Sequence, residues 1–281
     1  MRRKVFYVTG SRGFVGIDLC DELLKQGYEV LDDIIIAGRR IDLAEEQLGD
    51  FLQAGIDVMV HLAARVPHHS GVNDDAVLKE INKRIDENVA STALKINAKL
   101  IYVSGCGLYR RDSCEPLTEK SLVKTRSPYF ESKLFGEDIS MQNSRTAVLR
   151  ISAPYGKVLN PTTVLGNFIA KGRIGHGIEI WGTGKREQDF VSTHDITQAV
   201  VACMAHNCKG IFNIAAGCPT TMEDLAGFVI DRFGNEKLVS DHIDPLDYER
   251  VRIDISKAES ILGWSPQTTI ENWVRELKLD D

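Results

Sequence analysis

Residues 4–16 have the sequence Lys4-Val5-Phe6-Tyr7-Val8-Thr9-Gly10-Ser11-Arg12-Gly13-Phe14-Val15-Gly16. The first five form an apolar run rich in β-favouring side chains, which predicts a buried strand. Glycines then recur at every third position, and apolar residues continue at helical spacing as far as Lys25: Ile17, Cys20, Leu23 and Leu24. Such a turn lets the backbone approach a pyrophosphate and places that anion at a helix N-terminus. The stretch therefore predicts a dinucleotide-binding strand–turn–helix unit.

The alternation of strands and helices continues through residue 155. Further strands are predicted at residues 33–37, 57–62, 100–104 and 146–151. Residues 75–96 form an amphipathic helical pattern with one apolar side, made by Leu78, Ile81, Ile85 and Val89. This alternation predicts an α/β fold, a doubly wound parallel sheet with helices on both faces. From Gly156 the pattern changes to glycine-containing loops, and apolar strand-and-helix character returns at residues 189–215.

Composition excludes several classes of function. The chain has 281 residues and a net charge of −6, with no long basic run, which argues against nucleic-acid or membrane-surface binding. No apolar run approaches the ~20 residues of a membrane span, and no signal-peptide pattern is present. The six cysteines lack C-x-x-C pairing, so we expect reduced thiols in a cytoplasmic protein. His68-His69 has no third ligand at metal spacing nearby, and we expect no metal site.

A candidate catalytic pair lies in the middle of the chain. Tyr129 and Lys133 are four positions apart, so on a helix they share one face. A neighbouring ammonium favours the phenolate and lowers the pKa of a tyrosine. Such a phenol could move a proton to or from a sugar hydroxyl. The same spacing arises by chance in many helices, and the pair gains its weight from the glycine motif upstream.

The glycine spacing G-x-x-G-x-x-G, together with Tyr129 and Lys133, resembles the short-chain dehydrogenase/reductase superfamily. The stretch from Thr9 to Gly16 resembles its extended branch, the NAD(P)-dependent sugar epimerase/dehydratase family. Further segments resemble landmarks of that family along nearly the whole chain: His61-Leu62-Ala63-Ala64, Ile101-Tyr102-Val103-Ser104, residues 149–156, Gly182-Thr183-Gly184, Gln188-Asp189-Phe190-Val191, Phe212-Asn213-Ile214 and residues 262–266. The set is specific, although no single late segment is.

The resemblance implies two domains with the site between them. Residues 1–155 and 188–215 would form the dinucleotide-binding Rossmann domain, and residues 156–187 and 216–281 a smaller mixed substrate-binding domain. The implied cofactor-binding residues are Gly10, Ser11, Arg12, Gly13, Phe14, Val15, Gly16, Arg39, Asp42, Leu43, Leu62, Ala63, Ala64, Tyr129 and Lys133. The family pairs helix 75–96 and the Tyr129 helix across a homodimer interface. Simple packing on the sheet would give the same pattern.

The choice between NAD and NADP depends on the end of the second strand, where an acid holds the ribose diol of NAD and an arginine meets the phosphate of NADP. Asp32-Asp33 precede Ile34-Ile35-Ile36, and Arg39-Arg40 follow. If residues 34–37 are the strand, the arginines fall near the adenosine ribose, which favours NADP over NAD. A solvated loop is the alternative.

The sequence differs from the family's pattern at the third catalytic residue. In the family this residue is a serine or threonine, four positions before the tyrosine of a Val-Tyr-Gly segment. Tyr109 is that tyrosine, so the matching position is Gly105, which has no side chain to donate a hydrogen bond. Ser104 would point to the opposite face of a regular strand. We expect Ser104, reaching in from an irregular strand end, or water to replace the missing group. Cys106 and impaired chemistry are the alternatives.

The resemblance also implies substrate contacts. They are Ser104, Cys106, Asn167, Arg250 and Arg252, the two arginines lying where the family binds a pyrophosphate. Surface charge is the alternative for both arginines. Gln188 replaces the family's arginine before Asp-Phe-Val. The three tryptophans, Trp181, Trp264 and Trp273, are predicted to be core residues.

Together these features predict an enzyme that uses NAD(P) to modify a nucleotide-activated sugar by oxidation and reduction. The family's sugar dehydratases need an Asp-Glu pair where this chain has Cys106-Gly107, which disfavours dehydration. Epimerisation and keto-reduction need only the tyrosine, the lysine and a nicotinamide. Two alternatives stay open: a carbonyl reductase acting on a substrate without a nucleotide, and a non-catalytic dinucleotide-sensing protein.

Overall fold

A computed structural model describes residues 2–32, 34–36, 39–52, 55–67, 74–110, 115–125, 127–238 and 240–278. The strands are β1 (Val5–Thr9), β2 (Glu29–Leu31), β3 (Ile35–Ile36), β4 (Arg39–Arg40), β5 (Val58–His61), β6 (Lys99–Gly105), β7 (Ala147–Ile151), β8 (Ala153–Tyr155), β9 (Ile178–Glu179), β10 (Glu187–Gln188), β11 (Phe190–Ser192), β12 (Gly210–Ile214), β13 (Thr220–Thr221) and β14 (Lys237–Leu238). The α-helices are α1 (Phe14–Lys25), α2 (Asp75–Lys95), α3 (Pro128–Ser140), α4 (Val164–Arg173), α5 (Thr193–Ala205), α6 (Met222–Phe233), α7 (Ser256–Leu262) and α8 (Ile270–Glu276). Two short 3₁₀ helices are η1 (Leu48–Asp50) and η2 (Cys106–Leu108).

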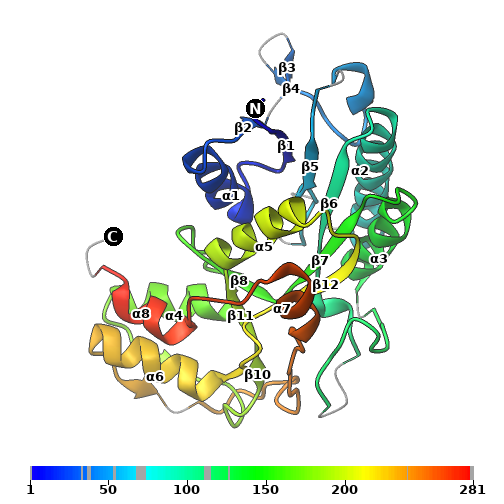
Figure 1. Cartoon of the computed structure of the whole chain (residues 1–281). Coiled ribbons are helices and arrows are strands. Elements are labelled where there is room, and N and C mark those ends of the chain that lie inside the picture. Colours follow the sequence, from blue (N-terminus) through cyan, green and yellow to red (C-terminus); the bar gives the residue numbers. More distant parts are fainter. Residues whose placement is uncertain are drawn as a thin grey trace.

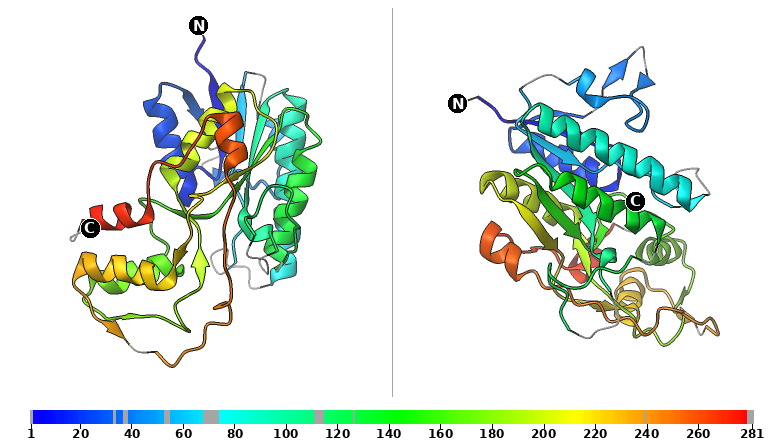
Figure 2. Two further views of the ribbon diagram at one scale, coloured as in Figure 1. Left: turned by 60° about the horizontal axis from the view of Figure 1, so that its bottom comes forward. Right: turned by 90° about the vertical axis from the view of Figure 1, so that its right-hand side faces the viewer.

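A parallel six-stranded sheet in the order β12-β7-β6-β5-β1-β2 forms the centre of the molecule (Figure 1). Alternate side chains of each strand point to opposite faces. Phe6 and Val8 pack in a cluster with residues of α1 and α5, whereas Val5 and Tyr7 pack in another with residues of α2. Figure 2 shows the two helix layers flanking the sheet. The predicted doubly wound α/β fold is confirmed.

The order of the strands places a crevice beside β1. The chain moves outward from β1 to β2, and β5 then pairs on the other side of β1. At such a reversal the loops after neighbouring strands diverge, and ligands bind outside the carboxyl ends. The ends of β1, β5 and β6 therefore frame the candidate site.

The second strand of the sheet is not where the sequence predicted it. The strand expected at residues 33–37 is wrong for the sheet, because the strand that pairs with β1 is β2 (Glu29–Leu31), with Val5 opposite Glu29 and Tyr7 opposite Leu31. Ile35 and Ile36 instead pair with Arg40 and Arg39 in the antiparallel β3–β4 hairpin, at the top of Figure 1. The edge strand β2 is short and mostly exposed, so it lacks the apolar pattern that favoured residues 34–36. Asp33 and residues 37–38 lie outside the described residues.

A separate apolar cluster lies below the sheet in Figure 1. It is built from residues of β8, α4, β9, α6 and α8, including Phe168, Leu225 and Val274. After β11 the chain returns through α5 to β12, which completes the central sheet. We propose the domain boundaries given above, with one exception. Ala258, Leu262 and Trp264, expected in the substrate-binding domain, pack in the cluster of the central sheet. No helix in the described part of the chain is long and apolar enough to cross a membrane.

Candidate active site

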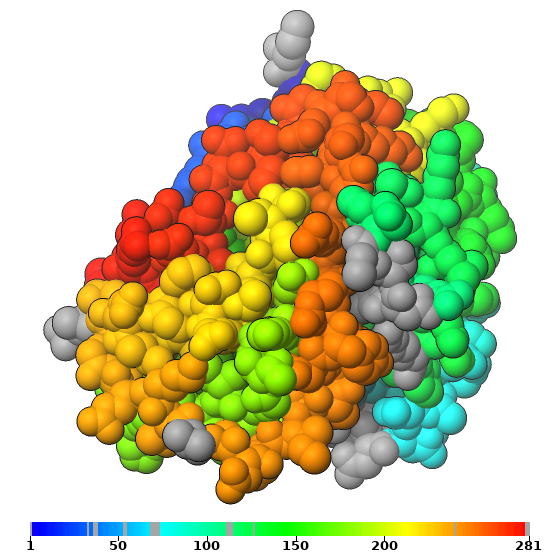
Figure 3. Space-filling view, turned by 90° about the horizontal axis from the view of Figure 1, so that it is seen from below, coloured from blue at the N-terminus to red at the C-terminus, as the bar shows by residue number. Residues whose placement is uncertain are grey.

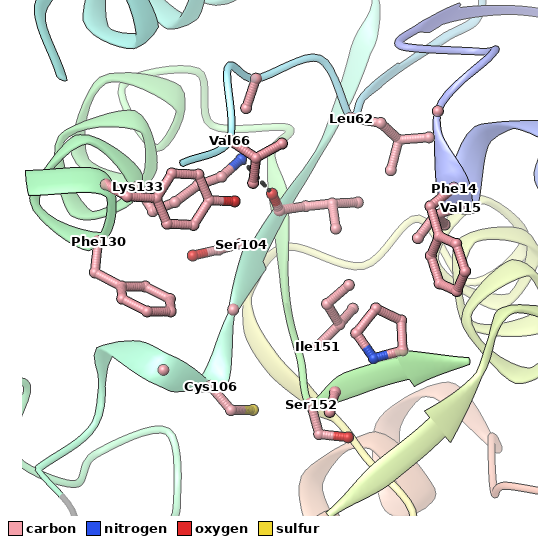
Figure 4. Close-up of a pocket in the computed structure, with 18 of the residues that line it drawn as sticks. Phe14, Val15, Leu62, Val66, Ser104, Cys106, Phe130, Lys133, Ile151 and Ser152 are labelled. Atoms are coloured by element: carbon pink, nitrogen blue, oxygen red, sulfur yellow. Dashed lines mark hydrogen bonds between the residues drawn. The ribbon is translucent and has the colours of Figure 1, made fainter. Parts of the chain in front are cut away.

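A cavity of about 500 Å³ opens at the carboxyl ends of the central strands (Figure 4). Most of its lining is apolar or glycine, with a few polar side chains converging from β6, α3, β10 and the residue that follows β7. The lining residues are Gly10, Gly13, Phe14, Val15, Gly16, Leu62, Ala63, Ala64, Val66, Val103, Ser104, Gly105, Cys106, Gly107, Tyr129, Phe130, Lys133, Ile151, Ser152, Ala153, Pro154, Gln188, Asp189 and Val251. This mixture is typical of a small-molecule or cofactor site.

The turn between β1 and α1 has the shape that a pyrophosphate needs. Gly10 has φ +72° and lies against the backbone of Ala63, so a side chain there would be strained and blocked. A Cβ at Gly16 would overlap the backbone of Gly10 and Ser11. Helix α1 starts after Gly13 with no side-chain cap, whereas α2, α3, α4, α5, α6 and α8 each start with a capping side chain. Its first N–H groups are therefore suited to an anion, and the turn fits a dinucleotide.

Helix α3 brings Tyr129 and Lys133 to the cavity together. The helix starts at Pro128 after the cap Ser127, and Glu137 in its third turn forms a buried two-bond ion pair with Arg150 of β7, at 2.9 and 2.6 Å. Lys133 is only 6% exposed, and its Nζ donates to the Val103 carbonyl at 3.1 Å, the dashed line in Figure 4. The helix that carries Tyr129 and Lys133 is thus anchored to two central strands.

The end of β6 explains how Ser104 can reach the cavity. The expected irregular strand end is wrong, because β6 pairs in regular register with β7 through Gly105 before it turns into η2. Ser104 and the three residues after it all line the cavity. The Ser104 Oγ is buried and has no hydrogen-bond partner in the described structure. A Cβ at Gly105 would lie 3.5 Å from the nearest atom of Phe130, an ordinary contact, so space for a side chain exists there. The Cys106 Sγ instead donates to the Arg150 carbonyl at 3.1 Å.

The predicted cofactor residues divide into two groups. Ten line the cavity: Gly10, Gly13, Phe14, Val15, Gly16, Leu62, Ala63, Ala64, Tyr129 and Lys133. Five do not: Ser11, Arg12, Arg39, Asp42 and Leu43. Ser11 is buried within the glycine turn with its Oγ unpartnered, and Leu43 packs against the core cluster of Val89.

Arg39 lies on the β3–β4 hairpin and is held by an acid. Its guanidinium donates two bonds to the Glu46 carboxylate, at 2.6 and 2.9 Å. The hydrogen bond from Arg39, aided by the backbone N–H of Asp42, lowers the pKa of Glu46 to about 2. Asp42 itself lies 3.8 Å from Arg65. The expectation of NADP required an arginine soon after the second strand of the sheet. The residue that follows β2 is instead Asp32, so this requirement is not met.

A second cavity of about 530 Å³ lies between α4, β9 and the segment around Asp244. Asn167 lines it, together with Lys171, Trp181 and Arg186. The prediction that Trp181 is a core residue is wrong: its side chain is 52% exposed and stacks on His242 at 4.9 Å. Figure 3 shows from below that the orange C-terminal segment and the light-green segment of α4 and β9 lie side by side on this face. Trp264 is buried, as predicted, and Trp273 packs at the edge of the lower cluster.

The two predicted pyrophosphate arginines are not brought together with Asn167. Neither lines either cavity in the part of the chain that the structure describes. Arg250 donates to the carbonyls of Asp247 and Glu249, both at 2.9 Å, and Arg252 is exposed. Arg186, which sequence reasoning missed, lies in the second cavity and pairs with Asp244 at 3.2 Å.

Several other lining residues were not predicted as site residues. Phe130, Ser152, Pro154, Gln188 and Asp189 all line the main cavity. The segments 149–156 and 188–191 already resembled family landmarks, and that resemblance was the available indication. The described residues hold no group of three His, Cys, Asp or Glu side chains arranged for a metal ion.

Asp189 is a buried carboxyl at the wall of the cavity. It is 1% exposed, and its Oδ1 accepts hydrogen bonds from Ser152 Oγ at 2.7 Å and from the Ala216 N–H at 2.8 Å. Burial raises the pKa of Asp189 to about 6, although Ser152 and the N–H groups of Ala216 and Gly217 oppose the rise. The other carboxyl oxygen, Oδ2, has no hydrogen-bond partner in the described structure. Folding therefore favours the protonated form.

This raised pKa predicts a pH dependence of stability. The protonated carboxyl contributes stability fully below about pH 4, and the contribution is lost as pH rises through about 6. Asp189→Asn keeps an oxygen for Ser152 and Ala216 but does not ionise. Its free energy of unfolding, relative to the wild type, should rise by roughly 2–3 kcal/mol between pH 4 and pH 7.5 in urea titrations. A difference that stays flat across this range would contradict the assignment.

The chain resembles known proteins over nearly its whole length. The model of the NAD-dependent epimerase/dehydratase family matches residues 6–215. A protein of Methanocaldococcus jannaschii described as a putative UDP-glucose 4-epimerase is 27% identical over 295 residues, covering 96% of both chains. UDP-glucuronic acid decarboxylase 1 of Arabidopsis thaliana is 27% identical, covering 99% of this chain and 70% of that protein. The crystal structure of UDP-N-acetylglucosamine 4-epimerase from Bacillus cereus has the same fold, with TM-score 0.86, 24% identity and 97% of each chain covered.

Proposed function

Because the chain belongs to the NAD-dependent epimerase/dehydratase family, we propose that it oxidises and reduces a hydroxyl-bearing carbon of a nucleotide-activated sugar. The observation that carries this proposal is the shared cavity. One space joins the uncapped glycine turn of α1 to Tyr129, Lys133 and Ser104. A cofactor extending from that turn would bring its nicotinamide end to the catalytic pair.

Each residue of the pair has a separate task in this proposal. Tyr129 exchanges the proton of the sugar hydroxyl, and the Lys133 ammonium favours the phenolate while it holds the nicotinamide ribose. Ser104, whose buried Oγ lacks a partner, orients the reacting hydroxyl. Phe14, Leu62 and Ile151 form apolar walls that exclude water. The nicotinamide, when bound, supplies the hydride acceptor and donor.

The second cavity is proposed to hold the nucleotide part of the substrate. Arg186 and Lys171 supply positive charge for a diphosphate, Asn167 supplies hydrogen bonds, and Trp181 offers an aromatic face for a base. Asp244 already pairs with Arg186, so the carboxylate would have to share this arginine with the ligand. Arg250 and Arg252 stay candidate pyrophosphate ligands, and Arg250 would first have to release the carbonyls of Asp247 and Glu249.

Between epimerisation and keto-reduction we favour epimerisation, because the relative described as a putative UDP-glucose 4-epimerase matches this chain over 96% of both lengths. In an epimerase the keto sugar is reduced again on its other face, so the cofactor is regenerated on the enzyme. In a reductase the cofactor leaves after each turnover.

For the cofactor we propose NAD over NADP, reversing the preference that the sequence suggested. Asp32 follows the last residue of β2, the position at which an acid holds the ribose diol of NAD. Arg39 is bound by Glu46 on a hairpin outside the sheet. An arginine in a two-bond ion pair must give up that pair before it can bind a phosphate.

One experiment tests the reaction class and the cofactor together. We expect the freshly purified protein to release NAD⁺ on denaturation, detected by mass spectrometry, and to interconvert UDP-glucose and UDP-galactose without added reductant. Fluorescence titrations of the emptied protein should show NADH binding at least about tenfold tighter than NADPH, and Glu46→Gln, which releases Arg39, should narrow that ratio. An empty protein that binds NADPH best would refute the cofactor assignment and indicate a reductase.

We also propose a homodimer formed through α2 and α3. These helices pack side by side on one outer face of the molecule (Figure 2). Val77 and Leu94 of α2 are 47% and 60% exposed, which leaves apolar surface for a partner copy. Light scattering after size-exclusion chromatography should give twice the chain mass of 31.3 kDa. No disulfide joins the five described cysteines, and we place the enzyme in the cytoplasm.

A further inference from the structure

The ammonium group of Lys133 has an aromatic partner. Its Nζ lies 5.0 Å from the centre of the Tyr102 ring, in addition to its hydrogen bond to the Val103 carbonyl. An aromatic face attracts a cation within about 6 Å, and the attraction grows when water is excluded. Because Lys133 is almost wholly buried, little water competes with this contact.

The Tyr102 ring is fixed in place by contacts with Asp86, His61 and Gly136. The side chain is fully buried, and its hydroxyl donates to Asp86 Oδ2 at 3.2 Å. Its edge packs against the His61 ring at 5.5 Å with an interplanar angle of 70°. Gly136 of α3 lies so close that a Cβ there would overlap the hydroxyl. Burial raises the pKa of Tyr102 well above its usual range, helped by Asp86 and Tyr129, so the hydroxyl stays a donor.

A buried hydrogen-bonded chain continues from Asp86 to the cofactor side of the cavity. Asp86 Oδ1 lies 2.9 Å from His61 Nε2, and His61 Nδ1 lies 2.7 Å from Thr9 Oγ1. A carboxylate only accepts, so Nε2 carries the proton in this pair. Thr9 Oγ1 also accepts from the N–H of Ala63, which lines the cavity. His61 and Asp86 are 1% and 2% exposed.

We propose that Tyr102 is the positioning residue for Lys133, holding the ammonium on its ring face while Asp86, His61 and Thr9 fix the ring. Tyr102 is not among the residues that line the cavity in the described part of the chain, so it acts through Lys133. The chain of hydrogen bonds joins β6, α2, β5 and β1, and so links the ring beneath Lys133 to the strand that precedes the glycine turn. The inference rests on the proposed roles of Tyr129 and Lys133.

The test separates the charge of the ring face from the shape of the ring. Tyr102→Phe keeps the ring, and 3,4,5-trifluorophenylalanine at the same position keeps its approximate size but removes the negative face. Ionisation of Tyr129 is followed by ultraviolet absorbance as pH is raised. Each protein is compared with the same protein carrying Tyr129→Phe, so the difference reports that one phenol and needs no substrate or cofactor.

We expect the midpoint of the Tyr129 ionisation in Tyr102→Phe to lie within about 0.3 pH unit of the midpoint in the wild type. The fluorinated ring should move the midpoint upward by roughly 0.5–1 pH unit, a threefold to tenfold loss of phenolate stabilisation. The other charged groups around the pair are unchanged: Asp86 on α2, Glu137 with Arg150, and Lys79 with Glu131. Should Tyr102→Phe not fold, 3,5-difluorotyrosine at this position gives the same comparison with the Asp86 bond retained.

Equal midpoints in the fluorinated and unfluorinated proteins would overturn the inference. Trifluorophenylalanine at Tyr155 is the matched control, because that buried ring packs against Trp273. It should leave the Tyr129 midpoint unchanged. A separate NADH titration tests the proposed function independently of the role of Tyr102. A wild-type protein that does not bind NADH would contradict the proposed function, while the absorbance titration would still decide whether Tyr102 positions Lys133.

Discussion

Replacing Tyr129 by phenylalanine should lower turnover by about 10²–10⁴-fold, the range for loss of a general acid–base group. The change removes one oxygen from a half-buried ring and leaves its contact with Phe130, at 5.3 Å, in place. The Lys133 ammonium keeps its bond to the Val103 carbonyl and stays available to the cofactor. NADH affinity should therefore stay within about threefold of the wild type. Epimerase or reductase turnover measured beside an NADH titration tests both statements.

A second variant, Ser104→Ala, tests the proposed role of Ser104 in the same reaction. If Ser104 orients the reacting hydroxyl, turnover should fall by about tenfold, the cost of one hydrogen bond to the substrate, while the fold and NADH binding are kept. Unchanged turnover would remove Ser104 from the mechanism and leave water in its place. A fully active Tyr129→Phe protein would end the proposed mechanism altogether.

The elements that were predictable are those whose pattern is local and whose burial is complete. β1, β5, β6 and β7 are central strands with almost unbroken apolar runs, and each was predicted within a residue or two of its observed bounds. The glycine turn and the Tyr129–Lys133 pair were also visible, because both depend on spacing within one segment. β2 was missed since an edge strand of three half-exposed residues carries no such pattern.

Features built from distant segments were not predictable. Trp181 and Arg186 meet Asp244 across about sixty residues of chain, and only the fold places them in one cavity with Asn167. The buried chain from Thr9 through His61 and Asp86 to Tyr102 draws on four elements, and none of these residues was predicted as a site residue. Sequence spacing cannot show a hydrogen bond between side chains that far apart, so the positioning of Lys133 appears only in three dimensions.

Gly16→Ala should weaken NADH binding by about 10- to 100-fold. A Cβ at this position would lie 2.7 Å from the Ser11 carbonyl oxygen and would overlap that of Gly10, so backbone must shift. Overpacking of this kind costs about 1–3 kcal/mol, and the shift falls on the uncapped N–H groups that are proposed to bind the pyrophosphate. Fluorescence titration with NADH measures the loss, and circular dichroism establishes that the variant is folded at the temperature used.

Two further alanine variants separate crowding from the effect of helical glycine itself. A Cβ at Gly13 would come no closer than 3.1 Å to Gly10 O, so Gly13→Ala should weaken NADH binding less than Gly16→Ala. Gly227 lies within α6 with open space around its Cβ position, so Gly227→Ala should stabilise the protein by about 0.5–1 kcal/mol and leave NADH binding unchanged. Equal NADH affinity in Gly16→Ala and Gly227→Ala would mean that the cofactor does not bind at the glycine turn. The dinucleotide site would then have to lie elsewhere, because no other described α-helix that opens on the main cavity begins without a capping side chain.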